Sequence, residues 1–136
     1  MAEQDETTDR ETVEDERHAL ISSRRVEGTP VYSRGGDKLG SIHSVMIGKR
    51  SGQVAYALLS FGGFLGIGEL VHPVPWAVLD YDPDRDGYVV DLTREQLEQA
   101  PAFRVDQADR PHERSRDELV YSYYGQIPWW GSMPPF

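Results

Sequence analysis

The sequence predicts a mainly β domain with two short helices and flexible tails. From Thr29 onward, short apolar runs alternate with turns rich in glycine, a pattern typical of strands joined by tight connections. Two helix-start signals follow the last of these runs. A chain of 136 residues can bury one hydrophobic core, and the absence of cysteine excludes disulfide bonds and thiolate metal sites.

Charge sets the first part of the chain apart from the rest. Residues 1–17 hold eight acidic and two basic side chains, a net charge of −6 out of −9 for the whole chain. Because this segment has few apolar side chains, we expect an acidic disordered tail there. A domain is predicted over residues 18–101 and an extension over residues 102–136. The negative charge argues against nucleic acid as a partner, and the lack of a secretory or transit signal predicts a cytoplasmic protein.

Two hairpins are predicted in the first half of the domain. Residues 31–33 and 39–47 flank a glycine-containing turn, and a second turn at residues 48–52 leads to a strand over residues 54–59. Since this last run is apolar at both parities, we expect it to be covered on both faces and central to the core.

A run of 18 uncharged residues, 51–68, is long enough to raise the question of a membrane span. Glycines interrupt it, and its continuously apolar part is only as long as a strand. No membrane span is therefore predicted.

The second half of the domain begins with an edge or barrel-corner strand at residues 70–76. Pro73 and Pro75 remove backbone donors from the same side of that strand. Shorter strands are predicted at residues 79–81 and 88–91.

The first predicted helix follows these strands directly. Thr93 and Gln96 have the spacing of a capping box, Leu92 and Leu97 that of a hydrophobic staple, and Pro101 ends the helix.

A second helix is predicted in the extension. Ser115 and Glu118 repeat the capping-box spacing, Leu119 and Tyr123 share a face, and Gly125 suits the position after the last helical residue.

Several segments between residues 20 and 101 together follow a known family pattern. They are, in order, Val31-Tyr32, residues 36–42, 51–56 and 61–68, Pro75-Trp76, and residues 97–101. On these segments, the chain resembles the PRC-barrel domain family. The family includes the cytoplasmic domain of the photosynthetic reaction-centre H subunit, the C-terminal domain of a ribosome-maturation factor, and stand-alone bacterial proteins, which this chain resembles most. One departure is Gly48, where the family pattern has an acidic residue.

The resemblance implies a small antiparallel PRC-type β-barrel and a non-catalytic protein-binding or adaptor role with an unknown partner. It also implies structural roles for the motif residues Gly40, Gly62, Gly63, Gly66, Gly68, Pro75 and Trp76. Two alternatives stay open, a small-ligand or calcium-responsive barrel module and a ribosome-assembly accessory protein.

The candidate partner-binding residues form two groups. Phe64, Leu65 and Ile67 either plug the core from a loop or face outward as a contact patch. Trp129 and Trp130 either cover the sheet edge within the chain or dock across a two-fold axis in a homodimer. In the contact reading, the acidic tail steers basic partners.

An acidic turn provides the calcium alternative. Asp82, Asp84 and Asp86 match positions 1, 3 and 5 of a calcium loop, but Thr93 stands at position 12, where such loops have glutamate. A hairpin turn is the favoured interpretation.

Neither a catalytic centre nor a cofactor or metal site is predicted. The four histidines are scattered, and the two acidic side chains three residues apart on the first helix suit a solvated face. These side chains are His18, His43, His72, His112, Glu95 and Glu98. We therefore expect that the protein is not an enzyme.

Overall fold

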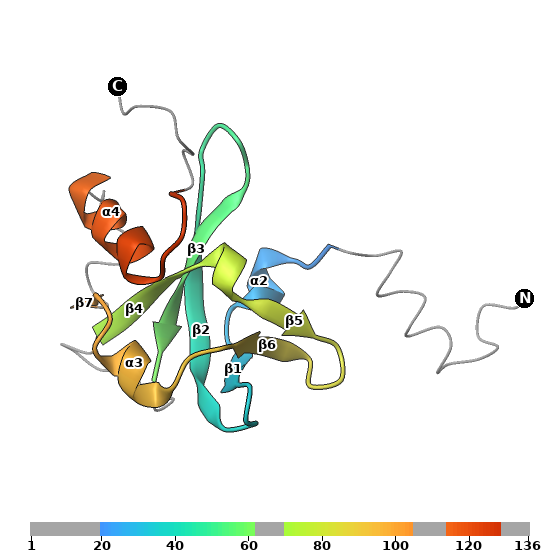
Figure 1. Cartoon of the computed structure of the whole chain (residues 1–136). Helices are drawn as coiled ribbons and strands as arrows, with labels where there is room; N and C mark the ends of the chain where they lie inside the picture. The colour runs from blue at the N-terminus through green and yellow to red at the C-terminus, as the bar shows by residue number, and fades with distance from the viewer. Residues whose placement is uncertain (1–19, 62–69, 105–113, 129–136) are drawn as a thin grey trace, which may run out of the picture.

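The computed structural model describes residues 20–61, 70–104 and 114–128 as a mainly β domain (Figure 1). Its elements in chain order are α2 (Ser23–Val26), β1 (Pro30–Ser33), β2 (Lys38–Ile47), β3 (Val54–Ser60), β4 (Leu70–Pro75), the 3-10 helix η2 (Trp76–Val78), β5 (Asp80–Asp82), β6 (Gly87–Val90), α3 (Arg94–Glu98), β7 (Phe103–Arg104) and α4 (Arg114–Tyr123). The strands form one sheet in the order β5-β6-β1-β2-β3-β4-β7. The mainly β prediction is confirmed, whereas the predicted acidic tail lies outside the described residues.

All six predicted strands are present, with ends that differ from the prediction by no more than one residue. The two hairpin turns use glycine where the backbone requires a positive φ, at Gly36 (φ +101°) and Gly52 (φ +74°). The ends of these strands could be predicted because each turn lies between two apolar runs.

The sheet departs from an antiparallel barrel in two ways. β1 pairs with β6 in parallel, with Val31 opposite Tyr88, while the other pairings are antiparallel. Within the described ranges, no hydrogen-bonded pairing joins the end strands β5 and β7, so the sheet is open. Both end strands are short, with three and two residues. The closed barrel that the resemblance implies therefore stays a prediction.

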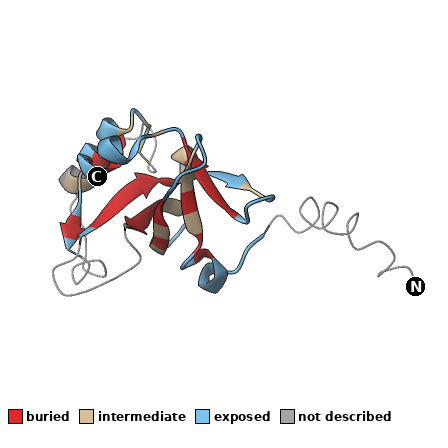
Figure 2. Cartoon of the chain, turned by 90° about the horizontal axis from the view of Figure 1, so that it is seen from below, coloured by how far each residue is buried: buried red, intermediate tan, exposed pale blue. Residues whose placement is uncertain are grey.

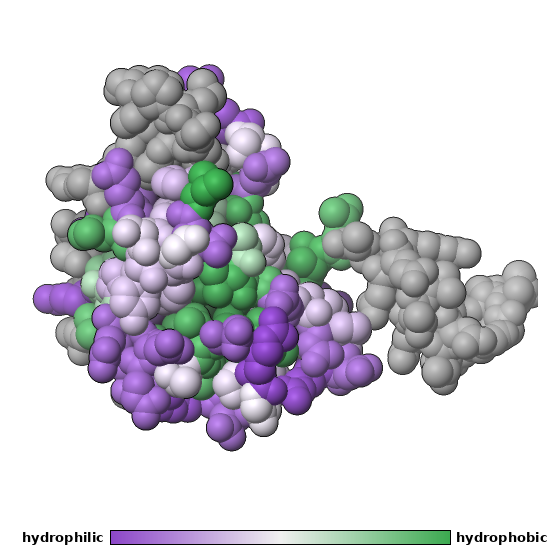
Figure 3. Space-filling view, in the orientation of Figure 1, coloured by the Kyte–Doolittle hydropathy of each residue, from purple (hydrophilic) through white to green (hydrophobic). Residues whose placement is uncertain are grey.

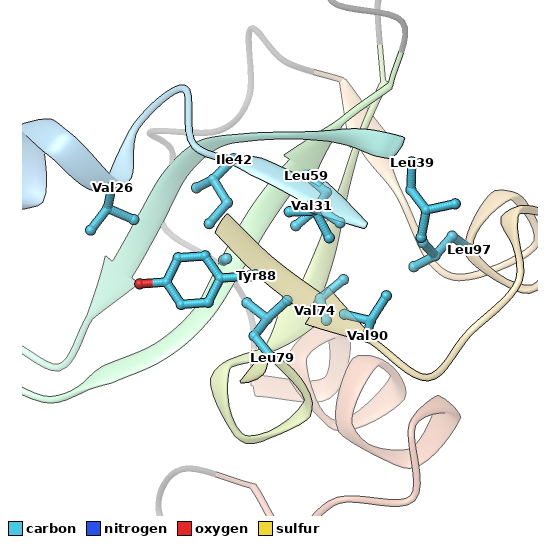
Figure 4. Close-up of a cluster of buried hydrophobic side chains, with 11 residues drawn as sticks. Val26, Val31, Leu39, Ile42, Leu59, Val74, Leu79, Tyr88, Val90 and Leu97 are labelled. Carbon is cyan, nitrogen blue, oxygen red and sulfur yellow. The ribbon is translucent and has the colours of Figure 1, made fainter. Parts of the chain in front are cut away.

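β3 lies between β2 and β4 and is buried on both faces, as predicted. Ala57 and Leu59 belong to the larger core cluster, whereas Tyr56 and Leu58 belong to a second cluster shared with α4. This alternation follows the two-residue period of a strand. Figure 4 shows the larger cluster, in which side chains of α2, β1, β2, β3, β4, β6 and α3 meet. Buried positions concentrate in the strands (Figure 2).

The capping box at α3 is confirmed. The Gln96 backbone N–H donates to Thr93 Oγ1 at 3.1 Å, and the Thr93 N–H donates to Gln96 Oε1 at 2.8 Å. Leu92 and Leu97, the predicted staple, both pack in the larger core cluster. The capping box and the packing of these two leucines therefore stabilise the start of α3.

The predicted helix in the extension is α4, but it begins at Arg114, so Ser115 lies within the helix and is not its N-cap. The end is as predicted. Gly125 has a φ of +66°, and the Gln126 N–H donates to the Tyr121 carbonyl at 2.9 Å, which gives the Schellman geometry.

A third helix, α2, was not predicted. It is one turn long, and its N-cap Ser22 accepts a hydrogen bond from the Arg24 N–H at 3.2 Å. So short a segment shows no helical period in the sequence. Val26, its buried residue, joins the larger core cluster.

Candidate functional site

An apolar groove lies between α4, β7 and the start of β4. Its volume is about 450 Å³. The described residues that line it are Leu70, Pro73, Pro101, Ala102, Phe103, Arg104, Arg116, Leu119 and Val120. We call this surface the apolar groove.

Two leucines on the apolar groove are open to solvent. Leu119 on α4 is 66% exposed and Leu70 on β4 is 49% exposed. The charged side chains of the lining are both arginines, and the Arg116 guanidinium lies 5.0 Å above the Phe103 ring. The groove thus offers apolar surface beside positive charge, in a chain whose net charge is −9.

The groove is positioned by contacts between α4 and β3. The Tyr121 hydroxyl donates to the Ala55 carbonyl at 3.0 Å, and the Tyr121 ring meets the Tyr56 ring edge to face at 6.3 Å between centroids. Val120 and Tyr121 are buried, so the helix turns Leu119 outward. Leu119 and Tyr123 share a face as predicted, and that face is the exposed one.

β7 forms the other wall. It pairs with β4 at two positions, Leu70 with Arg104 and Val71 with Phe103. Beyond them, Pro73 and Pro75 pair with β3 and cannot donate backbone hydrogen bonds to a further strand. The part of β4 with the prolines is therefore unpaired on its outer side among the described residues. Because β4 lies between β3 and β7, the predicted edge character holds for this part alone and not for the whole strand.

A second, polar groove lies where the β1–β2 hairpin, the β6–α3 connection and the end of α4 meet. It consists of two adjoining hollows of about 540 and 960 Å³. Arg34 and Asp80 form an exposed ion pair at 2.8 Å, and Arg94 donates to the Lys38 carbonyl at 2.8 Å. Figure 3 shows an apolar area over η2 and its neighbouring strands, with hydrophilic residues around it. Charges of both signs line this groove, so it favours no single ligand class.

The acidic turn after β5 is held by its own contacts. Asp82 Oδ1 accepts from the Asp84 N–H at 3.0 Å, and Asp86 Oδ1 accepts from the Tyr81 hydroxyl at 2.8 Å. Arg85 lies 3.6 Å from Asp82. Within the described ranges, no group of three histidine or acidic side chains could hold a metal ion. The calcium alternative gains no support here.

The described histidines lie in strands. His72 is 5% exposed, and its ring centroid lies 4.8 Å from that of Phe61. Burial lowers the pKa of His72, and the nearby backbone and charge of Glu98 partly oppose that shift. His43 Nδ1 lies 2.9 Å from Ser44 Oγ. His18 and His112 lie outside the described residues.

Three family-motif residues lie in the described part and occupy packed positions. A Cβ at Gly40 would collide with the Ser60 carbonyl oxygen and lie 3.0 Å from Phe61. Pro75 is buried opposite Tyr56. The Trp76 ring is partly buried and meets the Tyr88 ring at 5.2 Å between centroids. The structural roles that the resemblance implies for them stay a prediction.

The other candidate residues lie outside the described ranges. These are the contact candidates Phe64, Leu65, Ile67, Trp129 and Trp130 and the motif glycines Gly62, Gly63, Gly66 and Gly68. Sequence reasoning, in turn, did not select Leu70, Phe103, Arg116 or Leu119 as contact residues. The sequence shows that Leu119 is adjacent to Val120 and Tyr121, but it does not tell which of these three side chains the helix buries. The structure shows that Val120 and Tyr121 are buried and Leu119 is exposed.

The chain is a small mainly β domain, in which one sheet is joined by tight turns and covered in part by α4. A family model for the PRC-barrel domain matches residues 19–97, more than half of the chain, so the chain belongs to the PRC-barrel domain family. It is also similar to a protein of Deinococcus radiodurans described as uncharacterized, with 29% identity over 93 residues. That alignment covers 68% of this chain and 33% of the relative, so it spans about a third of the relative's length.

One further finding concerns the helices. In the part of the chain that the structure describes, every helix is too short or too polar to cross a membrane.

Proposed function

We propose that this chain is a non-catalytic protein-binding module whose apolar groove docks a partner segment that carries apolar and acidic side chains. The observation that supports this is the pairing of two exposed leucines, Leu70 and Leu119, with arginine as the charged component of the lining. Exposed apolar surface beside a groove is typical of a docking site.

Both the apolar side chains and the arginines of the groove would contribute to the free energy of binding. Burying an exposed leucine contributes about 1–2 kcal/mol from apolar area. A carboxylate placed near Arg116 would add a charge-assisted hydrogen bond, which fixes orientation more than it adds affinity. Arg116 already lies over the Phe103 ring, so its guanidinium is held at the groove.

In the sequence, a residue of the groove lies close to the segment that sequence analysis selected. Leu70 is two residues after Gly68, the end of the glycine-rich segment that contains Phe64, Leu65 and Ile67. Leu70 therefore follows the other candidate contact residues closely along the chain. Steering of basic partners by the acidic tail stays a separate prediction, because that tail is outside the described residues.

A cross-linking experiment tests the proposal, since a chain without cysteine accepts a single labelled one. Leu119→Cys carries a photoreactive label at the groove, and Leu20→Cys carries the same label at a leucine that is 92% exposed and lines none of the grooves described above. We expect a protein partner from native lysate to be joined through position 119 and not through position 20.

Purified components then test affinity. Leu119→Ser should weaken binding of the cross-linked partner about tenfold, Leu20→Ser should leave it unchanged, and added salt should weaken it further if Arg116 contacts a carboxylate. Equal cross-linking from both positions, or binding that Leu119→Ser does not alter, would reject the groove as the docking site.

A further inference from the structure

A small apolar hollow lies on the other side of α4, away from the apolar groove. Its volume is about 250 Å³, smaller than the usual site for a drug-sized ligand and suited to one large side chain. The residues that shape it come from the turn before β3, β3, the end of β4, η2, α4 and the chain beyond α4, and include Ala55, Pro75, Trp76, Tyr121 and Ile127. We call it the aromatic hollow.

The described chain ends at the rim of this hollow. Ile127 lines the hollow but is itself 75% exposed, and the last described residue is Pro128. Eight residues follow, and they begin with two tryptophans. Residues 129–136 of the same chain are therefore the candidate occupant that the sequence supplies at this point.

The direction of the chain selects one of these two tryptophans. Ile127 precedes a proline, which favours an extended backbone at Ile127, and proline itself is compatible with an extended chain. In an extended chain, side chains two residues apart point to the same side. In such an extended chain, Trp129 would follow Ile127 toward the aromatic hollow, and Trp130 would point away.

We propose that the Trp129 indole fills the aromatic hollow of its own chain and thereby holds α4 against β3. The lining matches this occupant, because Trp76 and Tyr121 provide aromatic surface and Pro75 and Ala55 provide apolar surface. Trp129 then belongs to the domain, and Trp130 is the side chain left for contact with other molecules. This inference is independent of the function proposed for the apolar groove.

A spin label at the rim tests the position of the indole. Gln53 is exposed and lines the hollow, so Gln53→Cys carries the label, and Ser23→Cys, an exposed residue of α2, is the matched control. Indole N–H signals are assigned with Trp129→Phe and Trp130→Phe. We expect the label at position 53 to remove the Trp129 signal at every protein concentration, and the label at position 23 to leave it.

Two results would overturn the proposal. An unchanged Trp129 signal with the label at position 53 would show that the Trp129 indole does not fill the hollow. Loss of the signal from isotope-labelled chains that carry no spin label, when they are mixed with spin-labelled chains, would show that a second copy supplies the tryptophan.

A second measurement distinguishes a seated indole from a nearby one. Trp129→Ala should raise the hydrogen-exchange rate of the α4 amides by roughly tenfold, while Trp130→Ala should change it by less than about twofold. Equal effects of the two substitutions would contradict the assignment of Trp129 to the hollow.

Discussion

The Tyr56 hydroxyl in β3 donates a hydrogen bond to the Asp117 carboxylate in α4 at 3.2 Å, although the two residues are 61 positions apart in sequence. Burial raises the pKa of Tyr56, and the negative charge of Asp117 raises it further, so the hydroxyl remains a donor at neutral pH. Together with the bond from Tyr121 to the Ala55 carbonyl, this contact joins the extension to the centre of the sheet.

Removing that hydroxyl should loosen α4. We expect Tyr56→Phe to lower the free energy of unfolding by about 1 kcal/mol, the net contribution of one such hydrogen bond. Denaturant unfolding measures the loss, and hydrogen exchange should show it first in α4. Tyr32→Phe, at a half-buried tyrosine of β1, serves as control and should change stability little. Equal losses in the two variants would count against a specific Tyr56–Asp117 contribution.

Gly40 should tolerate no side chain. A Cβ there would collide with the Ser60 carbonyl oxygen at the end of β3, and both partners are backbone in the sheet. We expect Gly40→Ala to destabilise the domain by about 1–3 kcal/mol, as overpacking does. Gly35→Ala is the matched control, because a Cβ at Gly35 meets only Ser33 Oγ at 3.7 Å. A melting temperature that Gly40→Ala leaves unchanged would contradict this close approach.

The strands could be predicted because their limits are encoded locally. Residues 48–52 and the turn before β2 each place glycine where a hairpin needs it, and the run from Val54 is apolar at both parities, as a strand covered on both faces requires. The same holds for α3, whose start depends on two residues three positions apart.

Pairings between distant segments could not be predicted in this way. The parallel contact between Val31 in β1 and Tyr88 in β6 depends on where the chain returns after η2, and no local pattern records that return. The apolar groove has the same origin, since it joins Leu70 to Leu119 across 49 positions and depends on which face α4 buries. Sequence analysis therefore predicted β4 and α4, but neither β7 nor the association of the three elements.

The capping box should control α3 as a unit. Thr93→Ala removes the side-chain acceptor for the Gln96 N–H but leaves the backbone N–H that donates to Gln96 Oε1, so we expect a loss of about 1 kcal/mol in the free energy of unfolding. Gln96→Ala should cost less, and the double variant should cost less than the two losses added, because the bonds are reciprocal. Chemical denaturation of the three variants measures this. Fully additive losses would show that the two bonds act separately.

Calcium should not bind the turn after β5. Asp86 is engaged with the Tyr81 hydroxyl, and the Arg85 cation lies 3.6 Å from Asp82, so two of the three carboxylates already have partners. Titration calorimetry with millimolar calcium should show no binding heat. A heat that Asp84→Asn abolishes would restore the calcium alternative.

Stability should fall in mild acid because of His72. Burial lowers the pKa of His72 in the folded state, whereas in the unfolded chain it titrates near 6.5, so the unfolded chain binds the proton more tightly. The stabilisation is complete above about pH 6.5 and is lost as the pH falls from there toward the folded-state pKa, by no more than about 1.4 kcal/mol per pH unit for one proton. Urea unfolding between pH 8 and pH 5.5 should show this slope, and His72→Gln should flatten it, because glutamine is polar but does not titrate. His43→Gln leaves His72 in place and should keep the slope of the unmodified chain. A slope that persists in His72→Gln would assign the pH dependence to another group.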